Sequence, residues 1–399
     1  MAIVRTRRSR RIPGMSLSDN NASSPAGTDG GGDRRGSGPL RRGWTTGACA
    51  TAATRAAYVA LLTGTFPDPV TIALPRGDTP SFDLLRMELG SHHASASIVK
   101  DAGDDPDVTH GAVISAEVRA GTAGTGVVFE AGPGVGTVTL PGLPIAPGEP
   151  AINPVPRKLM TETINEIAGR FAIAGDVVVR VSVDDGQAIA KQTWNPRLGI
   201  IGGLSILGTT GVVVPYSCAA WIHSIHRGID VARASGLQHV AGATGATSEA
   251  AAQLLYGLPD IAMLDMGDFA GAMLKYLRDH RLPRVTIAGG FAKLAKLAAG
   301  HSDLHSSRSQ VNTGFLAGLL HDSGAAYSEV TLARSARSAG EVLQIAGSHK
   351  TALAHAVAER AQQTAVAVLN GRNSSPSSIQ LDVLVIDRAG KVLARSHGR

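Results

Sequence analysis

Three widely spaced segments carry residue types suited to holding a polar, charged ligand. They are residues 42–50 (RGWTTGACA), 99–109 (VKDAGDDPDVT) and 193–215 (TWNPRLGIIGGLSILGTTGVVVP). Glycine lets backbone approach a ligand closely, threonine supplies a hydroxyl, and aspartate, lysine and arginine supply charge. The segments therefore predict ligand-binding loops, and their chemistry depends on the elements that position them.

The first segment predicts an anion site at a helix N-terminus. Thr45, Thr46 and Gly47 precede an alanine-rich stretch that we expect to be helical over residues 48–63, with Gly64 as its stop. Hydroxyls and unpaired N–H groups at a helix start attract anions. Ordinary capping by one of the two threonines is an equally good interpretation, although it explains one threonine and not the pair with a glycine.

The second segment crowds four aspartates behind a predicted strand. Lys100 and Asp101 are followed by Asp104, Asp105 and Asp107. Like charges this close raise one another's pKa unless a cation or hydrogen-bond donors intervene. A loop that orients a ligand or moves a proton is the favoured hypothesis, with Asp104 or Asp105 as general base. An Asx-turn cluster and a divalent metal site are the alternatives.

The third segment combines a glycine-rich turn with a basic residue. Gly208, Thr209, Thr210 and Gly211 allow close backbone approach to a ligand, but no Gly-Lys-Ser/Thr follows, so the turn is not a Walker loop. Arg197 lies next to turn-forming residues and is a candidate partner for a carboxylate. A solvated surface charge is the competing interpretation for this arginine.

Up to about residue 192 the pattern predicts an α+β domain with a mixed sheet. The alanine-rich helix is followed by short strand-like runs with alternating apolar residues, and a second helix is expected over residues 158–168. The expected strands are residues 70–74, 82–89, 94–99, 112–119 and 177–183.

From residue 195 onward the pattern predicts an α/β domain with a parallel sheet. Three units repeat, each an apolar strand, a glycine-bearing loop and a helix, with strands at residues 238–241, 261–264 and 285–288. Ligands of such sheets bind beyond the carboxyl ends of the strands. The residues expected at these strand ends are Gly245, Glu249, Asp265, Gly289 and Gly290. An acidic residue at a strand end can accept hydrogen bonds from ribose hydroxyls, and helix capping is the alternative role for Glu249 and Asp265. A helix over 351–369 and strands at 381–386 and 392–394 complete the domain.

Length indicates the number of domains, and the charge distribution distinguishes the N-terminal tail from the rest of the chain. The 399 residues suit two domains, and we expect a disordered Arg/Gly/Ser-rich tail over 1–38, an N-terminal domain over 39–194 and a C-terminal domain over 195–399. Residues 1–42 hold nine Arg and three Asp, which accounts for the whole net charge of +6. The remaining chain is balanced, which argues against a nucleic-acid partner.

Cysteine content and hydropathy indicate a cytoplasmic protein without a membrane anchor. Cys49 and Cys218 are the two cysteines of the chain, which suits a reducing compartment. No apolar run reaches the roughly 20 residues that span a bilayer, and the arginine-rich start lacks the apolar region of a secretory signal. His223 and His226 share a helix face, but Cys218 is poorly aligned with them, so we predict no metal site.

In their order and spacing, the three segments resemble the CbiD family of cobalt-precorrin-5B C(1)-methyltransferases of the anaerobic cobalamin pathway. The resemblance covers residues 40–386. It implies S-adenosylmethionine as methyl donor and methylation at ring carbon C1 of a tetrapyrrole, giving cobalt-precorrin-6A, with cobalt arriving as part of the substrate. One departure is Leu304, where the family pattern has a threonine before the aligned His305.

The resemblance and the residue types together assign provisional roles. Catalysis is assigned to Asp104 and Asp105. The residues expected to bind the substrate are Thr45, Thr46, Gly47, Lys100, Asp101, Arg197 and His305. The residues expected to bind the donor are Gly208, Thr209, Thr210, Gly211, Gly245, Glu249, Asp265, Gly289 and Gly290. An ATP-dependent small-molecule kinase and a non-catalytic tetrapyrrole-binding protein are the alternative functions, and self-association into a homo-oligomer is left open.

Overall fold

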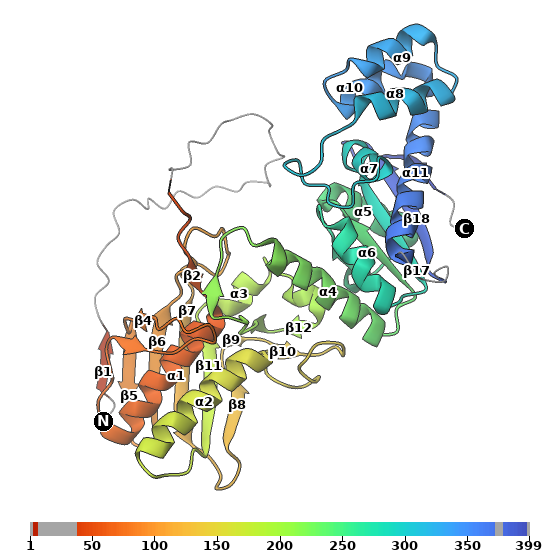
Figure 1. Cartoon of the computed structure of the whole chain (residues 1–399). Coiled ribbons are helices and arrows are strands. Elements are labelled where there is room, and N and C mark those ends of the chain that lie inside the picture. The colour runs from red at the N-terminus through yellow and green to blue at the C-terminus, as the bar shows by residue number, and fades with distance from the viewer. Residues whose placement is uncertain (1–2, 7–37, 372–377, 397–399) are drawn as a thin grey trace. The chain divides into compact units, whose positions relative to one another are not determined.

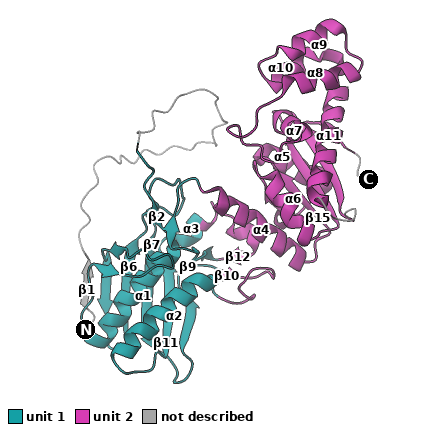
Figure 2. Ribbon diagram, in the orientation of Figure 1, with its two compact units in different colours: residues 1–136, 150–189, 202–216 teal, residues 137–149, 190–201, 217–399 magenta. Residues whose placement is uncertain are grey.

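The chain folds into two compact units, which Figure 2 distinguishes by colour. The structure, a computed structural model, describes residues 3–6, 38–371 and 378–396. Apart from residues 3–6 and 38, the tail expected over 1–38 lies outside these described residues. Unit 1 comprises residues 1–136, 150–189 and 202–216, and unit 2 comprises residues 137–149, 190–201 and 217–399.

Unit 1 is built on a six-stranded mixed sheet, as the sequence pattern predicts. Neighbouring strands are antiparallel except β8 and β11, which run parallel. Part of the expected tail forms its edge strand, β1. The strand order is β1 (Ile3–Thr6), β5 (Arg86–Leu89), β6 (His93–Val99), β7 (Val113–Ala120), β11 (Val177–Val183) and β8 (Val127–Ala131).

Two helices pack beside this sheet (Figure 1). In α1 (Thr46–Thr63), alanine side chains allow close packing against β6 and β7, and α2 (Pro154–Arg170) packs against α1. The ends of α1 are those predicted: the Thr45 side chain accepts a hydrogen bond from the N–H of Ala48, and Gly64 adopts the left-handed conformation with φ of 78°. Such a φ is costly for residues other than glycine, which explains the stop.

Short two-stranded pairs bring residues 202–216 into unit 1, although the sequence pattern placed them in the second domain. Gly134, at φ 78°, shows why glycine is needed there, because a Cβ at this position would lie 2.0 Å from the carbonyl oxygen of Val183. The pairs are β2 (Gly43–Trp44) with β14 (Val212–Val213) and β9 (Gly134–Val135) with β13 (Gly203–Leu204). Unit 1 also contains the separate pair of β3 (Val70–Thr71) with β4 (Ser81–Phe82) and a short helix, α3 (Gly186–Ala190).

Unit 2 is built on a five-stranded sheet whose first four strands run parallel, which confirms the α/β pattern expected from the three repeated units. The last strand is antiparallel to its neighbour. The strand order is β16 (Met263–Asp265), β15 (His239–Ala243), β17 (Arg284–Gly290), β18 (Gln380–Ile386) and β19 (Val392–Arg395).

Helices cover both faces of this parallel sheet. Alternating side chains of β17 show the division, because Ile287 belongs to the large core cluster whereas Ala288 belongs to a smaller cluster with Ala252. The smaller cluster lies beneath α5 (Ala246–Tyr256). The helices that contribute to the large cluster include α4 (Cys218–Ala234), α6 (Ala270–Asp279), α7 (Phe291–Ala298) and α11 (Lys350–Asn370).

Three further helices lie between α7 and α11 and were not predicted from the sequence. They pack against one another, and two of them, α8 and α10, also pack against α11 (Figure 1). They are α8 (Thr313–Asp322), α9 (Tyr327–Arg334) and α10 (Ala339–Ile345). The remaining elements of unit 2 are β10 (Thr137–Val138), β12 (Ile200–Ile201) and the 3₁₀ helices η1 (Asn195–Leu198), η2 (Asp260–Ala262) and η3 (Gly347–His349).

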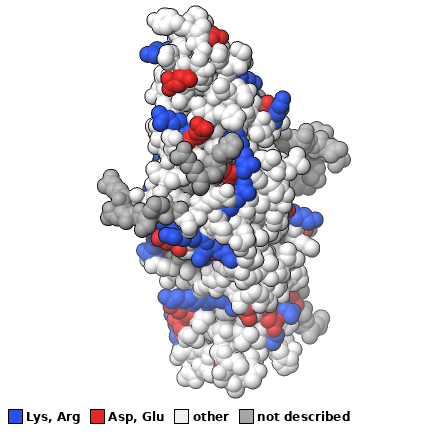
Figure 3. All heavy atoms as spheres, turned by 90° about the vertical axis from the view of Figure 1, so that its right-hand side faces the viewer, with Lys and Arg blue, Asp and Glu red and all other residues white. Residues whose placement is uncertain are grey.

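Positive and negative residues are mixed on the face drawn in Figure 3. Lys and Arg lie close to Asp and Glu there, and uncharged residues separate one such group from the next. Within the described residues, none of the helices combines the length and the apolar character that crossing a membrane requires.

Candidate functional site

Unit 2 contains a cavity of about 770 Å³ at the carboxyl ends of β15 and β16. This volume lies within the range of roughly 300–1,000 Å³ found for small-molecule sites. Its position is the one at which parallel sheets bind ligands. The lining residues are Lys191, Gln192, Thr193, Trp194, Pro196, Arg197, Trp221, Thr244, Gly245, Ala246, Glu249, Asp260, Asp265, Gly267, Asp268, Phe269, Lys293 and His305.

Arg197 and Glu249, assigned from the sequence to two different ligands, pair with each other in the cavity wall. The Arg197 Nη1 and Nη2 atoms donate to the two carboxylate oxygens of Glu249 at 2.9 and 2.5 Å. This pairing raises the pKa of the Arg197 guanidinium above its ordinary value. The Arg197 Cζ atom also lies 5.4 Å from the ring centroid of Trp194. The pair therefore connects the third sequence motif to α5, and its charges neutralise each other.

Asp265 ends β16 with a carboxylate at the cavity. Burial raises the pKa of this carboxyl group and the nearby charge of Glu249 raises it further, whereas Arg197 and Lys293 lower it. Within the described residues, no donor forms a hydrogen bond to its side chain. Its backbone oxygen accepts a hydrogen bond from the Trp221 indole at 2.9 Å. Asp265 is thus the cavity carboxylate that remains open to an incoming donor group.

Lys293 connects two of the loops that surround the cavity. Its Nζ atom donates to the carbonyl oxygen of Thr244 at 3.0 Å and lies 3.1 Å from Asp268 Oδ1. Gly245 lines the cavity directly, at the start of α5. The loops after β15 and β16 are therefore held together by one cation.

Gly289 and Gly290, expected to bind the donor, do not line the cavity. They end β17, and a Cβ on Gly289 would lie 2.8 Å from Thr244 Cγ2, so this glycine allows neighbouring strand ends to pack closely. Gly290 precedes α7 as its N-cap residue. Their role in this structure is packing and chain direction.

His305 lies at the cavity, while Leu304, the departure from the family pattern, points into the core. The Leu304 side chain is 1% exposed within the large cluster of unit 2. Its backbone N–H donates to the carbonyl oxygen of Asp268 at 2.9 Å, and its carbonyl oxygen accepts from Lys296 Nζ at 2.9 Å. The His305 Nδ1 atom lies 2.7 Å from Ser307 Oγ. An apolar side chain is therefore well accommodated before the histidine.

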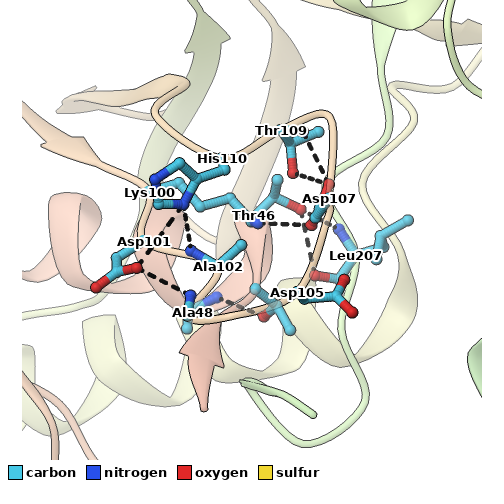
Figure 4. Close-up of polar contacts among 12 residues, drawn as sticks. Thr46, Ala48, Lys100, Asp101, Ala102, Asp105, Asp107, Thr109, His110 and Leu207 are labelled. Carbon is cyan, nitrogen blue, oxygen red and sulfur yellow. Dashed lines mark hydrogen bonds and ion pairs between the residues drawn. The ribbon is translucent and has the colours of Figure 1, made fainter. Parts of the chain in front are cut away.

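The anion site expected at the start of α1 is occupied by internal contacts of unit 1 (Figure 4). The N–H groups of Gly47 and Ala48 donate to the carbonyl oxygen of Leu207 at 2.9 Å and to Thr45 Oγ1 at 3.2 Å. Thr46 Oγ1 accepts from the N–H of Leu207 at 2.9 Å. Thr45 and Thr46 are 7% and 4% exposed. The capping alternative is thus the one observed for Thr45, and Thr46 and Gly47 hold the segment 205–207 against α1.

The turn at residues 208–211 lies on α1 and not among the loops of the parallel sheet. A Cβ on Gly208 would lie 2.3 Å from Thr45 Oγ1, and the N–H of Thr45 donates to the carbonyl oxygen of Gly211 at 3.0 Å. Thr210 Oγ1 lies 3.3 Å from the N–H of Val212, within the same turn. Thr209 belongs to this turn as well. These four residues, expected to bind the donor with the glycine loops, belong to unit 1 and do not line the unit 2 cavity.

Lys100 is part of an internal ion pair of unit 1 (Figure 4). The lysine is 1% exposed, and its Nζ atom donates to Asp107 Oδ2 at 2.7 Å. Asp107 also accepts from the N–H and the hydroxyl of Thr109. Burial alone would raise the pKa of Asp107, but these donors and the Lys100 charge outweigh it, so the pKa is lowered.

The other aspartates of the loop are also engaged in hydrogen bonds. Asp101 forms an ion pair with Arg41, which holds the pKa of this carboxyl group below its usual range. Asp104 accepts from the N–H of Arg41 at 2.6 Å, and Asp105 accepts from the N–H of Tyr216 at 2.8 Å. Asp101 and Asp107 also accept from the N–H groups two residues further on, those of Gly103 and Thr109, which is the geometry of the Asx-turn alternative. Neither of the two expected general bases lines the unit 2 cavity.

The histidines considered as metal ligands take part in aromatic packing. The rings of His223 and His226 lie edge to face at 6.2 Å, and His226 stacks on Tyr276 at 3.8 Å. Burial and the charge of His223 lower the pKa of His226. In the part of the chain that the structure describes, no group of three or more His, Cys, Asp or Glu side chains could hold a metal ion.

Sequence reasoning missed several cavity residues. Trp221 is on α4, between the 208–211 turn and the glycine loops of the parallel sheet, and no local pattern marked it. Lys293 and Asp268 follow the ends of β17 and β16, so the rule that placed Asp265 could have found them. Trp194 lies within the third motif and Lys191 lies just before it, but the glycines of the motif attracted the prediction instead.

Comparisons with known proteins agree with the resemblance seen in the sequence motifs. The family model described as CbiD matches residues 33–215, and the model of the CbiD C-terminal domain matches residues 303–397. A protein of Brucella anthropi named cobalt-precorrin-5B C(1)-methyltransferase is 60% identical over 89% of this chain and 95% of its own length. A protein of the same name from Brucella canis is 59% identical over the same shares.

A solved structure of related sequence is also known. The crystal structure of a cobalamin biosynthesis protein (cbiD) from Archaeoglobus fulgidus is 29% identical in sequence, with a TM-score of 0.37, over 67% of this chain and 83% of that chain. The family matches and the identity to the Brucella proteins, which extends over most of both chains, settle the family assignment. The chain belongs to the CbiD family.

Proposed function

We propose that this chain is an S-adenosylmethionine-dependent C-methyltransferase that methylates ring carbon C1 of cobalt-precorrin-5B to give cobalt-precorrin-6A. The observation that carries the proposal is the 60% identity, over 89% of the chain, to a protein named for this reaction. The cavity at the strand ends of unit 2 is the proposed donor site. Cobalt enters as part of the substrate.

The cavity residues fit the chemistry of the donor. S-adenosylmethionine carries a sulfonium cation, an amino acid, a ribose and a flat adenine ring, and the cavity lining includes carboxylates, amines and indoles. The open carboxylate of Asp265 suits the ribose hydroxyls, as acidic residues at strand ends do in other parallel sheets. Glu249, assigned the same role from the sequence, is already neutralised by Arg197.

The reaction itself makes modest chemical demands on the protein. S-adenosylmethionine supplies a methyl group activated by the sulfonium. The C1–methyl bond forms as the sulfur–methyl bond breaks, the sulfur keeps the electron pair and leaves as the neutral thioether, and a proton lost from the macrocycle restores the charge balance. Holding the reacting atoms in line contributes on the order of 7–11 kcal/mol in well-oriented systems.

Side chains of this unit have positioning roles in the proposal. The Arg197–Glu249 pair and the Lys293 bridge keep the cavity walls in place before ligands bind. Lys191 and His305, which line the cavity, are proposed to meet acetate or propionate groups of the macrocycle. The proposal does not include Lys100 in this role, because it is buried and paired with Asp107.

The test is a methyl-transfer assay with the purified full-length chain. Given S-adenosylmethionine and cobalt-precorrin-5B, the protein is expected to yield a product that carries one additional methyl group, detected by mass spectrometry. Asp265→Asn is expected to raise the KM for the donor about tenfold or more. Asp279→Asn, at an exposed carboxylate of α6 outside the cavity, is the matched control.

Each alternative function predicts a different result in the same preparation. Hydrolysis of ATP without methyl transfer would support the small-molecule kinase. Binding of the tetrapyrrole without any turnover would support the carrier. Either result, with fresh substrate and folded protein, contradicts the methyltransferase proposal.

A further inference from the structure

Trp221 presents a large aromatic surface at the proposed donor cavity. It is the fourth residue of α4, and 45% of its surface is exposed. It lines the cavity together with Asp265 and Gly267. Much of its indole surface is therefore available to a ligand in the cavity.

Contacts with the end of β16 hold the indole of Trp221 in one orientation. Its Nε1–H donates to the carbonyl oxygen of Asp265 at 2.9 Å. A Cβ built on Gly267 would lie 3.5 Å from the Nε1 and Cζ2 atoms of the ring, which is ordinary van der Waals contact. An aromatic ring fixed in this way loses little conformational entropy when a ligand binds against it.

The surroundings of Trp221 distinguish it from the other indole of the cavity. Trp194 already has the guanidinium of Arg197 over its ring at 5.4 Å. Two of the cavity carboxylates are also matched, because Glu249 pairs with Arg197 and Asp268 with Lys293. Trp221 instead contacts Asp265, a cavity carboxylate that has neither a hydrogen-bond donor nor an ion-pair partner among the described side chains.

We propose that Trp221 is the stacking platform for the adenine ring of the methyl donor, with the ribose hydroxyls reaching the carboxylate of Asp265. The assignment rests on the proposed function. A flat neutral heterocycle linked to a diol matches a fixed indole next to an open carboxylate, since the first needs an aromatic face and the second needs an acceptor. Trp221 is thus a binding residue for the donor and takes no part in bond making.

The experiment measures binding of S-adenosylhomocysteine and S-adenosylmethionine to the full-length chain by isothermal titration calorimetry. Removing a base-stacking aromatic costs roughly 1–3 kcal/mol, so Trp221→Leu is expected to weaken both ligands by about tenfold or more. Trp221→Phe keeps a ring and is expected to retain most of the affinity. Tyr327→Leu removes an 85%-exposed aromatic residue of α9, outside the cavity, and is expected to leave binding unchanged.

Fluorescence supplies a readout that a purely structural role would not change. Binding of S-adenosylhomocysteine is expected to quench the emission of the wild-type chain and of Trp44→Phe, which keeps Trp221. The quenching is expected to be much smaller in Trp221→Phe, whose remaining cavity indole is Trp194, than in Trp194→Phe, which keeps Trp221. Circular dichroism melting of each variant establishes that the compared proteins are folded.

The outcomes separate this inference from the proposed function. If the wild-type chain binds S-adenosylhomocysteine and Trp221→Leu binds it equally well, the stacking assignment is overturned and the methyltransferase proposal stands. If Trp221→Leu loses affinity for the cationic S-adenosylmethionine alone, the indole faces the sulfonium and the adenine assignment is overturned. If the folded wild-type chain binds neither ligand, the donor site itself is contradicted.

Discussion

Asp265 combines a structural cost with a proposed binding role. Its half-buried position and the neighbouring Glu249 raise its pKa, so the folded chain holds this proton more tightly than the unfolded chain. Stability from such a group is present below the ordinary pKa of 3.8 and is lost as the pH rises through the raised value. At neutral pH the ionised carboxylate therefore destabilises the fold.

Asp265→Asn is accordingly expected to raise the melting temperature at neutral pH by a few degrees while weakening donor binding. The gain is expected to shrink as the pH falls toward 3.8. In the wild type, affinity for S-adenosylhomocysteine is expected to fall as Asp265 is protonated, and the Asn variant is expected to lack this pH dependence. Thermal melts and titrations across the pH range measure both. An unchanged or lower melting temperature at neutral pH would contradict the stability prediction.

The two cysteines differ sharply in their environments. Cys49 is fully buried in α1, and burial raises the pKa of its thiol to about 12, whereas Cys218 is exposed at the start of α4. A thiol reagent that reacts with thiolates is expected to label Cys218 alone in the native protein at pH 8 and both cysteines after denaturation. Peptide mass mapping identifies the labelled residue. Rapid native labelling of Cys49 would show that α1 opens readily.

At the scale of elements, the Lys100–Asp107 pair holds the loop that joins β6 to β7. Lys100 is fully buried, and its ammonium group is paired with the Asp107 carboxylate. Asp107→Ala is expected to cost about 3 kcal/mol of unfolding free energy, because removing one partner leaves the other charge buried and unpaired. Urea denaturation measures the loss. The pKa of Asp107 is lowered, so the pair stabilises above the ordinary value of 3.8 and is lost as the pH falls through the lowered one.

Two variants test this interpretation of the loop. Asp104→Asn alters an exposed carboxylate of the same loop and is expected to cost about 1 kcal/mol or less. Combining Lys100→Met with Asp107→Ala removes both charges and is expected to recover much of the stability. A double variant as unstable as Asp107→Ala would mean that packing, and not the unpaired charge, determines the loss.

Elements with strong local signals were predicted well, and the weaker ones were not. The repeat of apolar strands and glycine loops correctly predicted the parallel strands of unit 2, and the strand at Val177–Val183 has the bounds expected for it. The helices α8, α9 and α10 are only 10, 8 and 7 residues long. Helices this short owe most of their stability to tertiary packing, so their sequence shows little periodicity.

At the scale of the whole molecule, the chain passes between the units more than once. Residues 202–216 complete unit 1, where β14 pairs with β2 and Thr46 contacts Leu207. A fragment ending at residue 194 lacks these partners, so we expect it to melt at a lower temperature than a fragment ending at residue 216 and to be cleaved faster by protease. Circular dichroism and limited proteolysis test this. Equal stability of the two fragments would show that unit 1 does not need the segment.

The amino-acid sequence alone determined the mixed and parallel sheets, the ends of α1, the family and the position of Asp265 at a strand end. These follow from periodicity, capping and strand-end rules, which act between residues close in the chain. Tertiary structure decided which polar groups are already engaged, because Arg197 meets Glu249 and Thr46 meets Leu207 only after distant segments fold together. Whether a charge or hydroxyl remains available to a ligand depends on such long-range partners and on burial, which no local pattern of residues encodes.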